Sequence, residues 1–317
     1  CTQTASVVSI DYSGQIFPKL SWIHIKVQDF IMGIFMRKCD ICISLTGYVY
    51  APRIAQKKGA IIIMERGSKH ILEQKKILEK NPHKKNEAIP NRNIKCNLKA
   101  YQFANFISVA SQHVKESFLL HQYPENRIFV NPYGVDLSMF KPLPNIPKKY
   151  DVIMVGGWGY EKGCDLIVEA IRKTNYSFIH VGSIKDVDFP QEKNFTHIDP
   201  VDQSKLIEYY NQAKVFILPS RQDGFGMVLS QALACNLPII GSNNCGAPDL
   251  KKMVELPEYI TIIKDYTADA IVTAIHTAIK NYEQLGERIY AGNAIENLTW
   301  EAYGKRYANF LHKIIKQ

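Results

Sequence analysis

A glycine-rich turn in the second half of the chain ends in a lysine. Residues 155–163 read VGGWGYEKG and directly follow the apolar run 151–155. Glycines let the backbone approach an anion closely, and Lys162 stands at the expected start of a helix, whose free N–H groups also favour phosphate. The pattern predicts a phosphate-binding turn. The alternative interpretation is an ordinary glycine turn with a solvated lysine.

A second candidate site, residues 219–240, places a carboxylate and an amide around a Gly-Phe-Gly turn. Asp223 and Gln231 are eight residues apart. If Asp223 lies in the turn and Gln231 lies two helical turns further on, both side chains can reach one ligand at the helix start. Such a pair suits the hydroxyl groups of a sugar. The alternative is that Asp223 caps the helix and Gln231 is half-buried within it.

Two further polar segments follow apolar runs. Residues 242–250 read SNNCGAPDL, for which a plain loop is the alternative interpretation. In the first half, residues 64–70 read MERGSKH and bring Arg66 and His70 to the end of an expected strand. If Ser68 caps a helix that begins at Lys69, His70 lies in its first turn. The alternative is a capping loop with solvated charges.

The elements that must position these residues alternate along the chain. The expected strands are residues 39–45, 60–64, 106–110, 127–131, 151–155, 177–181, 195–198, 214–218 and 237–241. The expected helices are residues 112–121 (with Ser111 as N-cap), 163–174, 203–213, 226–235, 268–281 and 299–315. This alternation favours an α/β fold with one open parallel sheet in each half. In such sheets, ligands bind outside the carboxyl ends of the strands.

Composition sets outer limits on the class of protein. The chain has 317 residues, of which 46% are apolar and 22% charged. This length and composition predict about two globular domains and exclude a disordered chain. The proline-rich stretch 141–149 is predicted to link them. No run approaches the ~18 apolar residues of a spanning helix, no secretory signal is visible, and dinucleotide and P-loop fingerprints are absent.

The seven scattered cysteines indicate reduced thiols in a cytoplasmic protein. Cys39 and Cys42 form a C-x-x-C pair, but no further ligands follow at zinc-site spacing, so we interpret Cys42 as a small hydrophobe inside a strand. An Asp-x-Asp pattern occurs only at Asp186 and Asp188, in an expected loop. The sequence therefore predicts no metal site.

Positive charge is concentrated in the first half. Residues 1–149 carry 22 Lys and Arg against 10 Asp and Glu, a balance of +12, whereas residues 150–317 have a balance of −3. An anionic membrane surface or an acidic substrate fits this asymmetry, whereas nucleic acid does not, because no recognition motif accompanies the charge. An apolar helical stripe also lies among basic residues: Phe30, Ile31, Ile34 and Phe35 beside Lys26, Arg37 and Lys38. The alternatives are a solvated lysine-rich face, which Lys57, Lys58, Lys75, Lys76, Lys84 and Lys85 would form, and packing of the stripe in the core.

Four stretches, in this order and spacing, resemble the family 4 glycosyltransferases of GT-B architecture. They are IFVNPYGVDLSMFKP (128–142), VGGWGYEKGCDLIVEA (155–170), the run 206–240 and TWEAYGKRY (299–307). The resemblance is close over residues 100–317 and loose over 39–80. Any one stretch alone is a weak signal, but the four together are specific.

The resemblance implies roles for residues of this chain. Asp223 matches the first position of the family's carboxylate-x7-carboxylate motif, which contacts the transferred sugar, and Gln231 matches the second, which holds the ribose hydroxyls. Lys162 matches the pyrophosphate-binding lysine, and Val201 falls where the nucleobase edge is read. Backbone N–H groups would come from Gly224, Phe225, Gly226 and Met227, and further donor contacts from Gly157 and Trp158. Arg66 and His70 lie where the family often supplies a histidine near the reacting sugar.

This chain departs from the family pattern at several positions. Gly157 stands where an arginine usually provides a second diphosphate cation, which leaves Arg66 and Arg221 as candidates to replace it. Gln231 stands where a carboxylate is usual, although an amide can both donate to and accept from ribose hydroxyls. Tyr133 and Asn236 replace an asparagine and a glycine of the pattern. The first half is short for the fold and lacks a Gly-Gly loop, which indicates a fragment or a rebuilt first strand.

The resemblance implies a GT-B-like α/β fold with two Rossmann-like parallel-sheet domains facing a cleft. The acceptor-side domain would be residues 1–140, the linker 141–149 and the donor domain 150–298, with helix 299–317 packing back on the first domain. It implies a retaining, metal-independent hexosyltransferase, without a cofactor, that moves sugar from a nucleotide-diphosphate sugar to a hydroxyl of a glycan or lipid-linked acceptor. The expected location is the cytoplasm, at the inner face of a membrane. The alternatives are a nucleotide-sugar epimerase or phosphorylase of the same architecture, and a degenerate, non-catalytic carbohydrate- or partner-binding protein.

Overall fold

The computed structural model describes residues 21–83, 89–285 and 296–316. The chain divides into two compact units, residues 1–65 with 91–106, and residues 66–90 with 107–317. This division falls inside the expected acceptor-side domain and not at 141–149, so the expected domain boundaries remain a prediction. Lys84 and Lys85 of the proposed basic surface lie outside the described residues.

The described part of the first unit consists of three helices and a parallel strand pair. Its elements are α2 (Ser21–Ile34), β1 (Ile41–Leu45), α3 (Tyr50–Lys57), β2 (Ile61–Arg66) and α5 (Asn91–Phe103). β1 and β2 run parallel, with Ile41 opposite Ile61. Cys42 lies within β1 as an unbonded thiol, as expected. Burial, followed by the neighbouring Cys39 thiol, raises the pKa of Cys42 to about 11, so Cys42 stays protonated at neutral pH.

Helix α2 packs on α3 through its polar and small residues. The Asp29 carboxylate is buried and accepts hydrogen bonds from the N–H groups of Val49, Tyr50 and Ala51 at 2.8–2.9 Å, where α3 begins. A Cβ added to Gly33 would lie 2.4 Å from the Tyr50 ring, so α3 also requires a glycine there. Asp29 and Gly33 therefore make the close packing of α2 on α3, and the half-exposed Phe30 ring lies at its edge, 5.3 Å from Tyr50 between ring centroids.

The apolar residues of α2 and its end point outward. Their exposed fractions run from 39% to 78% for the set Trp22, Ile23, Val27, Phe30, Ile31, Ile34 and Phe35, which we call the apolar stripe. Lys26, Arg37 and Lys38 beside it are also exposed. The alternative that the stripe packs in the core is wrong, because Asp29 and Gly33 occupy the packed side.

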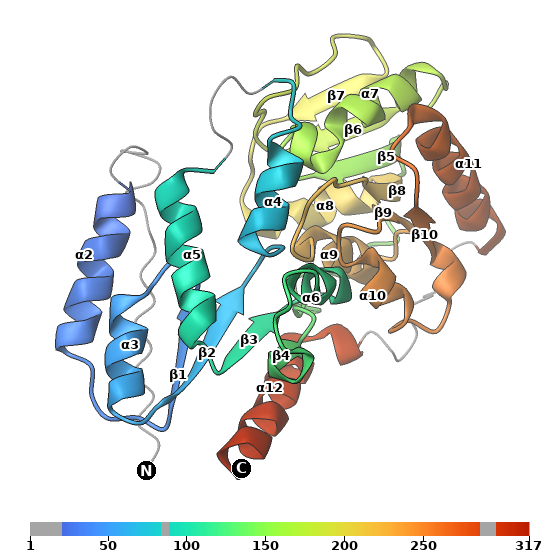
Figure 1. Cartoon of the computed structure of the whole chain (residues 1–317). Helices are drawn as coiled ribbons and strands as arrows, with labels where there is room; N and C mark the ends of the chain where they lie inside the picture. Colours follow the sequence, from blue (N-terminus) through green and yellow to red (C-terminus); the bar gives the residue numbers. More distant parts are fainter. Residues whose placement is uncertain (1–20, 84–88, 286–295, 317) are drawn as a thin grey trace. The chain divides into compact units, whose positions relative to one another are not determined.

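The second unit contains most of the strands and helices (Figure 1). Its helices of four residues or more are α4 (Ile71–Leu78), α6 (Gln112–Leu119), α7 (Cys164–Arg172), α8 (Leu206–Asn211), α9 (Met227–Ala234), α10 (Ala247–Lys251), α11 (Ala268–Leu285) and α12 (Trp300–Ile315). Its strands are β3 (Phe106–Val109), β4 (Ile128–Val130), β5 (Tyr150–Val155), β6 (Phe178–Val181), β7 (Phe195–Ile198), β8 (Ala213–Leu218), β9 (Ile239–Ser242) and β10 (Ile260–Ile263). Single 3-10 turns cover Glu125–Arg127, Tyr160–Lys162, Gln203–Lys205 and Pro257–Tyr259.

Two parallel sheets form the fold, with the strand orders β1-β2-β3-β4 and β10-β9-β8-β5-β6-β7. In the larger sheet β5 is central and pairs in parallel with β6 and β8, so that Val152 lies opposite both Phe178 and Val215. These central residues are fully buried, as expected for a parallel sheet that is covered on both faces. The expected α/β fold with one parallel sheet in each half is confirmed.

The last helix lies against residues of the first half of the chain. The Phe310 ring stacks on Phe129 of β4 with a centroid distance of 4.1 Å. Arg306 donates to Asn131 Oδ1 at 2.7 Å and to the Pro132 carbonyl at 2.8 Å. Helix α12 is thereby fixed to the end of β4.

Candidate functional site

Lys162 and Asp223, predicted from two separate segments, meet at one point. Lys162 Nζ donates to Asp223 Oδ2 at 2.6 Å, and both side chains are partly exposed, by 21% and 17%. Lys162 ends the 3-10 turn before α7, and Asp223 lies in the turn between β8 and α9. Burial disfavours the charged ammonium, but the adjacent Asp223 carboxylate outweighs it and raises the pKa of Lys162. The site therefore holds an ammonium–carboxylate pair that solvent can reach.

The other two expected segments join this turn through Asn244. The Asp223 N–H donates to the Asn244 carbonyl at 2.9 Å. Asn244 Oδ1 accepts from Lys69 Nζ at 2.6 Å. A Cβ added to Gly224 would lie 1.9 Å from the Gly67 carbonyl oxygen, so the two backbones approach as closely as glycine permits. The convergence of strand ends that the sequence predicts is thus present within the second unit.

Two residues of this cluster were not singled out as ligands or supports from the sequence. Ser111 was predicted to cap α6, but its Oγ donates to the Gly224 carbonyl at 2.5 Å, and no side-chain hydrogen bond caps the helix. His113 Nε2 donates to the Asp223 carbonyl at 2.8 Å. His113 is only 8% exposed, and burial lowers its pKa to about 4, so the ring is neutral at pH 7. The sequence signal that could have pointed to both residues is their position just after a parallel strand.

The glycine-rich turn leads into the core at Trp158. Its indole is fully buried and packs on Phe189, with a centroid distance of 5.0 Å. Its backbone N–H donates to the Ser183 carbonyl at 2.8 Å. The expectation that Trp158 contacts a donor is corrected, since its ring fills the core and its amide is already bonded. Gly157 beside it is half-buried.

The N-terminus of α9 is open, although not every expected amide is free. Gly226, at φ +80°, precedes the helix, and no side chain caps it, while Met227 is exposed. The Gly224 N–H, however, donates to Asp223 Oδ1 at 2.7 Å. The Phe225 ring is buried and stands edge-on to Tyr133, with a centroid distance of 5.8 Å. The expectation for the Gly224 N–H is therefore corrected, whereas those for the N–H groups of Phe225, Gly226 and Met227 stay predictions. The first turn of α9 remains the anion-favouring part.

Gln231 is buried, whereas Val201 is partly exposed. Gln231 is buried on α9, where its Oε1 accepts from the hydroxyl of the fully buried Tyr210 at 3.0 Å. This matches the alternative interpretation of Gln231 as a buried polar residue of the helix. Val201 follows β7 and packs partly against the hydrophobic core.

The two candidate arginines are engaged in local contacts. Arg66 donates to the Lys69 carbonyl and, at 2.6 Å, to Gln74 Oε1. Arg221 forms two hydrogen bonds to Asp165, at 2.5 and 2.7 Å, and lies over the Tyr160 ring. Neither arginine is oriented to replace the side chain that Gly157 lacks.

His70 is a structural residue at the start of α4. It is the N-cap of a helix that begins at Ile71, so the prediction of a helix from Lys69 capped by Ser68 is wrong. Its N–H donates to Ser117 Oγ at 2.8 Å, and its ring stacks on His121 at 4.0 Å. Burial, followed by the His121 and Arg66 charges, lowers the pKa of His70 to about 3. The ring therefore stays neutral and packed.

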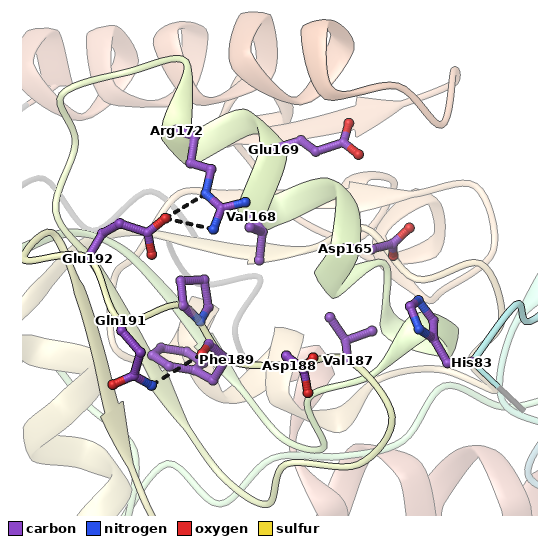
Figure 2. A pocket seen from close by; sticks show the side chains of 11 residues that line it. His83, Asp165, Val168, Glu169, Arg172, Val187, Asp188, Phe189, Gln191 and Glu192 are labelled. Carbon is purple, nitrogen blue, oxygen red and sulfur yellow. Dashed lines mark hydrogen bonds and ion pairs between the residues drawn. The ribbon is translucent and has the colours of Figure 1, made fainter.

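A separate hollow of about 750 Å³ lies along α7 and residues 187–192 (Figure 2). Its lining includes the carboxylates of Asp165, Glu169, Asp188 and Glu192, with Arg172 bonded to Glu192. None of the expected donor residues lines it. Because carboxylates dominate its charged groups, it repels a diphosphate.

The described residues, 21–83, 89–285 and 296–316, contain no group of three or more His, Cys, Asp or Glu side chains placed to hold a metal ion. Asp186, of the Asp-x-Asp pattern, accepts hydrogen bonds from the Tyr160 N–H and Asn81 Nδ2. Within the same residues, no helix combines the length and the apolar character needed to cross a membrane.

Comparison with solved structures identifies the fold. HepE of Anabaena, solved in complex with UDP and glucose, superposes with a TM-score of 0.67 at 14% identity, over 96% of this chain and 84% of that one. The sucrose-phosphate synthase of Thermosynechococcus elongatus gives 0.65 at 16% identity, over 98% and 81%. The two parallel sheets therefore have the GT-B arrangement of strands and helices.

Curated relatives and a family model agree with the fold. A probable sucrose-phosphate synthase of Thermosipho melanesiensis is 26% identical over 68% of this chain, which spans 56% of that relative's length. A GDP-mannose-dependent alpha-(1-6)-phosphatidylinositol monomannoside mannosyltransferase of Mycolicibacterium smegmatis is 23% identical over 66% of this chain and 62% of its own length. The family model for glycosyl transferases group 1 matches residues 138–294. This segment, which includes Lys162, Asp223 and Gln231, is similar to the glycosyl transferases group 1 family, and the chain has the GT-B fold.

Proposed function

We propose that this chain binds a nucleotide-diphosphate sugar and transfers the sugar to a hydroxyl of a glycan or lipid-linked acceptor, with retention at the anomeric carbon. The observation that carries the proposal is the Lys162–Asp223 pair at 2.6 Å, at the carboxyl ends of β5 and β8. Solved relatives in this fold bind UDP and glucose, as the HepE complex does. Asp223, Lys162 and the open start of α9 are the groups assigned to the donor.

The chemistry requires charge stabilisation on the departing diphosphate. Lys162 contributes an ammonium, and the uncapped first turn of α9 contributes backbone N–H groups and the positive end of a helix dipole. Groups fixed before the reaction stabilise charge that develops in the transition state without reorganising. Asp223, held through its N–H and its carbonyl by Asn244 and His113, presents its carboxylate to the sugar hydroxyls.

The test separates sugar contact from diphosphate binding. In Asp223→Asn, turnover with the sugar nucleotide should fall about tenfold to a hundredfold, the range expected for a lost charged hydrogen bond. Affinity for the bare diphosphate should change little, as measured by titration calorimetry. Thermal shifts with UDP, GDP and ADP identify the base first, since ligand at 100 times Kd stabilises by about 2.7 kcal/mol.

The alternatives give different results in the same experiments. An epimerase converts a labelled donor without an acceptor and leaves its nucleotide attached, whereas a transferase releases the nucleoside diphosphate. A non-catalytic binder gives a thermal shift without product. Loss of diphosphate affinity in Asp223→Asn, with turnover per bound donor unchanged, contradicts the assignment of Asp223 to the sugar.

The proposed working location is an anionic membrane surface at the cytoplasmic side. The apolar stripe of α2 is exposed and has Lys26, Arg37 and Lys38 beside it. A helix with one apolar face and basic neighbours lies in the headgroup region of a bilayer, and each Lys or Arg near an anionic leaflet adds about 1 kcal/mol. A lipid-linked acceptor would be reached from this surface.

A further inference from the structure

The proposed donor site needs more positive charge than Lys162 supplies. A diphosphate carries several negative charges, whereas Lys162 already neutralises Asp223 at 2.6 Å. Arg221 is paired with Asp165, and Arg66 donates to Gln74 and to the Lys69 carbonyl. The Lys69 ammonium is engaged by Asn244 Oδ1 at 2.6 Å. An anion at this turn therefore requires a second cation from elsewhere.

Lys185 lies directly across the glycine-rich turn. A Cβ added to Gly157 would be 2.3 Å from Lys185 Cε and 2.8 Å from its Nζ. The ammonium thus occupies the space that a side chain at residue 157 would fill. Lys185 is exposed, and its Nζ has no hydrogen-bond or ion-pair partner among the described residues. An unpaired cation beside a glycine backbone is arranged to receive an anion.

The backbone fixes the segment that carries Lys185. The Lys185 N–H donates to the Trp158 carbonyl at 2.9 Å, and the Trp158 N–H donates to Ser183 at 2.8 Å. Trp158 and Ile184 also form a parallel bridge. Asp186 Oδ1 accepts from the Tyr160 N–H at 2.9 Å. Because the turn after β6 is bonded residue by residue to the turn after β5, the backbone of Lys185 is held beside the glycine-rich turn before any ligand arrives.

We propose that Lys185 is the second diphosphate-binding cation of this site and reaches the donor across Gly157. A glycine at residue 157 leaves this space to the Lys185 side chain, which a residue with a Cβ would displace from its position. A lysine binds phosphate as a point charge from a flexible stem. Lys185 can therefore supply the positive charge that a glycine at residue 157 lacks. This inference rests on the proposed function, because it assumes a nucleoside diphosphate at the site.

The experiment compares two lysine variants by calorimetry. The probes are UDP, GDP and ADP, each against its own nucleoside, with the intact chain. Lys185→Ala should weaken the best-binding diphosphate about tenfold and leave its nucleoside unchanged, since only the phosphate contact is lost. Lys193→Ala, an exposed lysine before β7, is the matched control and should bind as the wild type does.

A double variant that moves the positive charge from residue 185 to residue 157 keeps the test independent of folding effects. Gly157 is not among the positive-φ residues, so it accepts a side chain once Lys185 is shortened. The double variant Gly157→Arg/Lys185→Ala should therefore regain diphosphate affinity relative to Lys185→Ala. Equal diphosphate affinity in Lys185→Ala and wild type, or an equal loss for the nucleoside, overturns the inference while the proposed function stands. Absence of diphosphate binding in the wild type defeats the proposed function itself.

Discussion

Lys162 has two partners in the proposed mechanism, the Asp223 carboxylate and the donor diphosphate. Lys162→Ala should weaken diphosphate binding about tenfold to a hundredfold. It should also lower the free energy of unfolding by about 1–2 kcal/mol, because Asp223 loses its partner in a partly buried site. Lys173→Ala is the matched control, since Lys173 pairs with Asp269 at the same 2.6 Å but on the surface. Calorimetry and urea unfolding measure both effects, and unchanged diphosphate affinity in Lys162→Ala rules out this role.

Gln231 is bonded to Tyr210 inside the protein, which gives it a measurable structural role. In Gln231→Ala the fully buried Tyr210 hydroxyl loses its acceptor, so the free energy of unfolding should fall by about 1–3 kcal/mol. Adding Tyr210→Phe should recover part of this loss, since no polar group is then left unpaired. Urea denaturation of the two variants, with Tyr210→Phe alone as the control, tests the coupling. Strictly additive losses would show that the two side chains do not depend on each other.

Sequence reasoning located the reacting segments better than it assigned their atoms. Lys162 and Asp223 were both expected at strand ends, and they meet because carboxyl ends of neighbouring parallel strands lie at one edge. Trp158 was misassigned, since a glycine-flanked aromatic can point into the core or out of it, and one sequence does not distinguish these. His113, Ser111 and Lys185 were missed because their contacts join residues about 30 to 110 positions apart.

Among the elements, α6 carries a buried histidine whose protonation makes the stability of the protein depend on pH. His113 at its first turn has a pKa of about 4, below the 6.5 of a free histidine, because burial disfavours its charged form. The unfolded chain therefore binds the extra proton first, and stability is lost as pH falls from about 6.5 to 4. One proton corresponds to at most about 1.4 kcal/mol per pH unit.

In His113→Gln the loss of stability over this range should be smaller, while the amide keeps a donor for the Asp223 carbonyl. Urea unfolding between pH 4.5 and 7 measures the slope. Part of the pH dependence of stability should remain in the variant, because His70 and His180 have pKa values of about 3 and 4. His276→Gln, exposed on α11, is the control and should leave the slope as it is in the wild type. A wild-type slope in His113→Gln contradicts the assignment.

The predictability of each element followed the strength of its local pattern. The buried β-branched runs at β2, β5 and β8 were located to within two residues, and β7 at 195–198 was correct at both ends. Helices α3, α5 and α10, and strand β10, were missed, and α4 begins at Ile71, two residues after the expected start at Lys69. Helix α5 is strongly polar, so it gives no sustained apolar period. The expected helix 203–213 divides into a 3-10 turn and the shorter α8.

At the scale of the whole molecule, the charge asymmetry and the exposed stripe belong to the same part of the sequence. Residues 1–149 carry the whole positive excess of +12. The apolar stripe of α2 lies within them, as do the exposed Lys57 and Lys58 at the end of α3. Charge brings a protein to an anionic surface, and buried apolar side chains keep it there. The two features therefore predict different dependences on salt and on mutation.

Binding to anionic vesicles should be measurable at low salt, fall as salt rises, and be absent for neutral vesicles, since charges are screened over about 8 Å at physiological ionic strength. Sedimentation with phosphatidylglycerol and phosphatidylcholine vesicles at two salt concentrations measures this. Ile31→Ser/Phe35→Ser should weaken binding about tenfold or more, because each buried apolar side chain contributes about 1.5–3 kcal/mol. Leu120→Ser, an equally exposed apolar residue after α6, is the control and should bind normally. No binding to anionic vesicles at low salt would leave the basic residues as a solvated surface only.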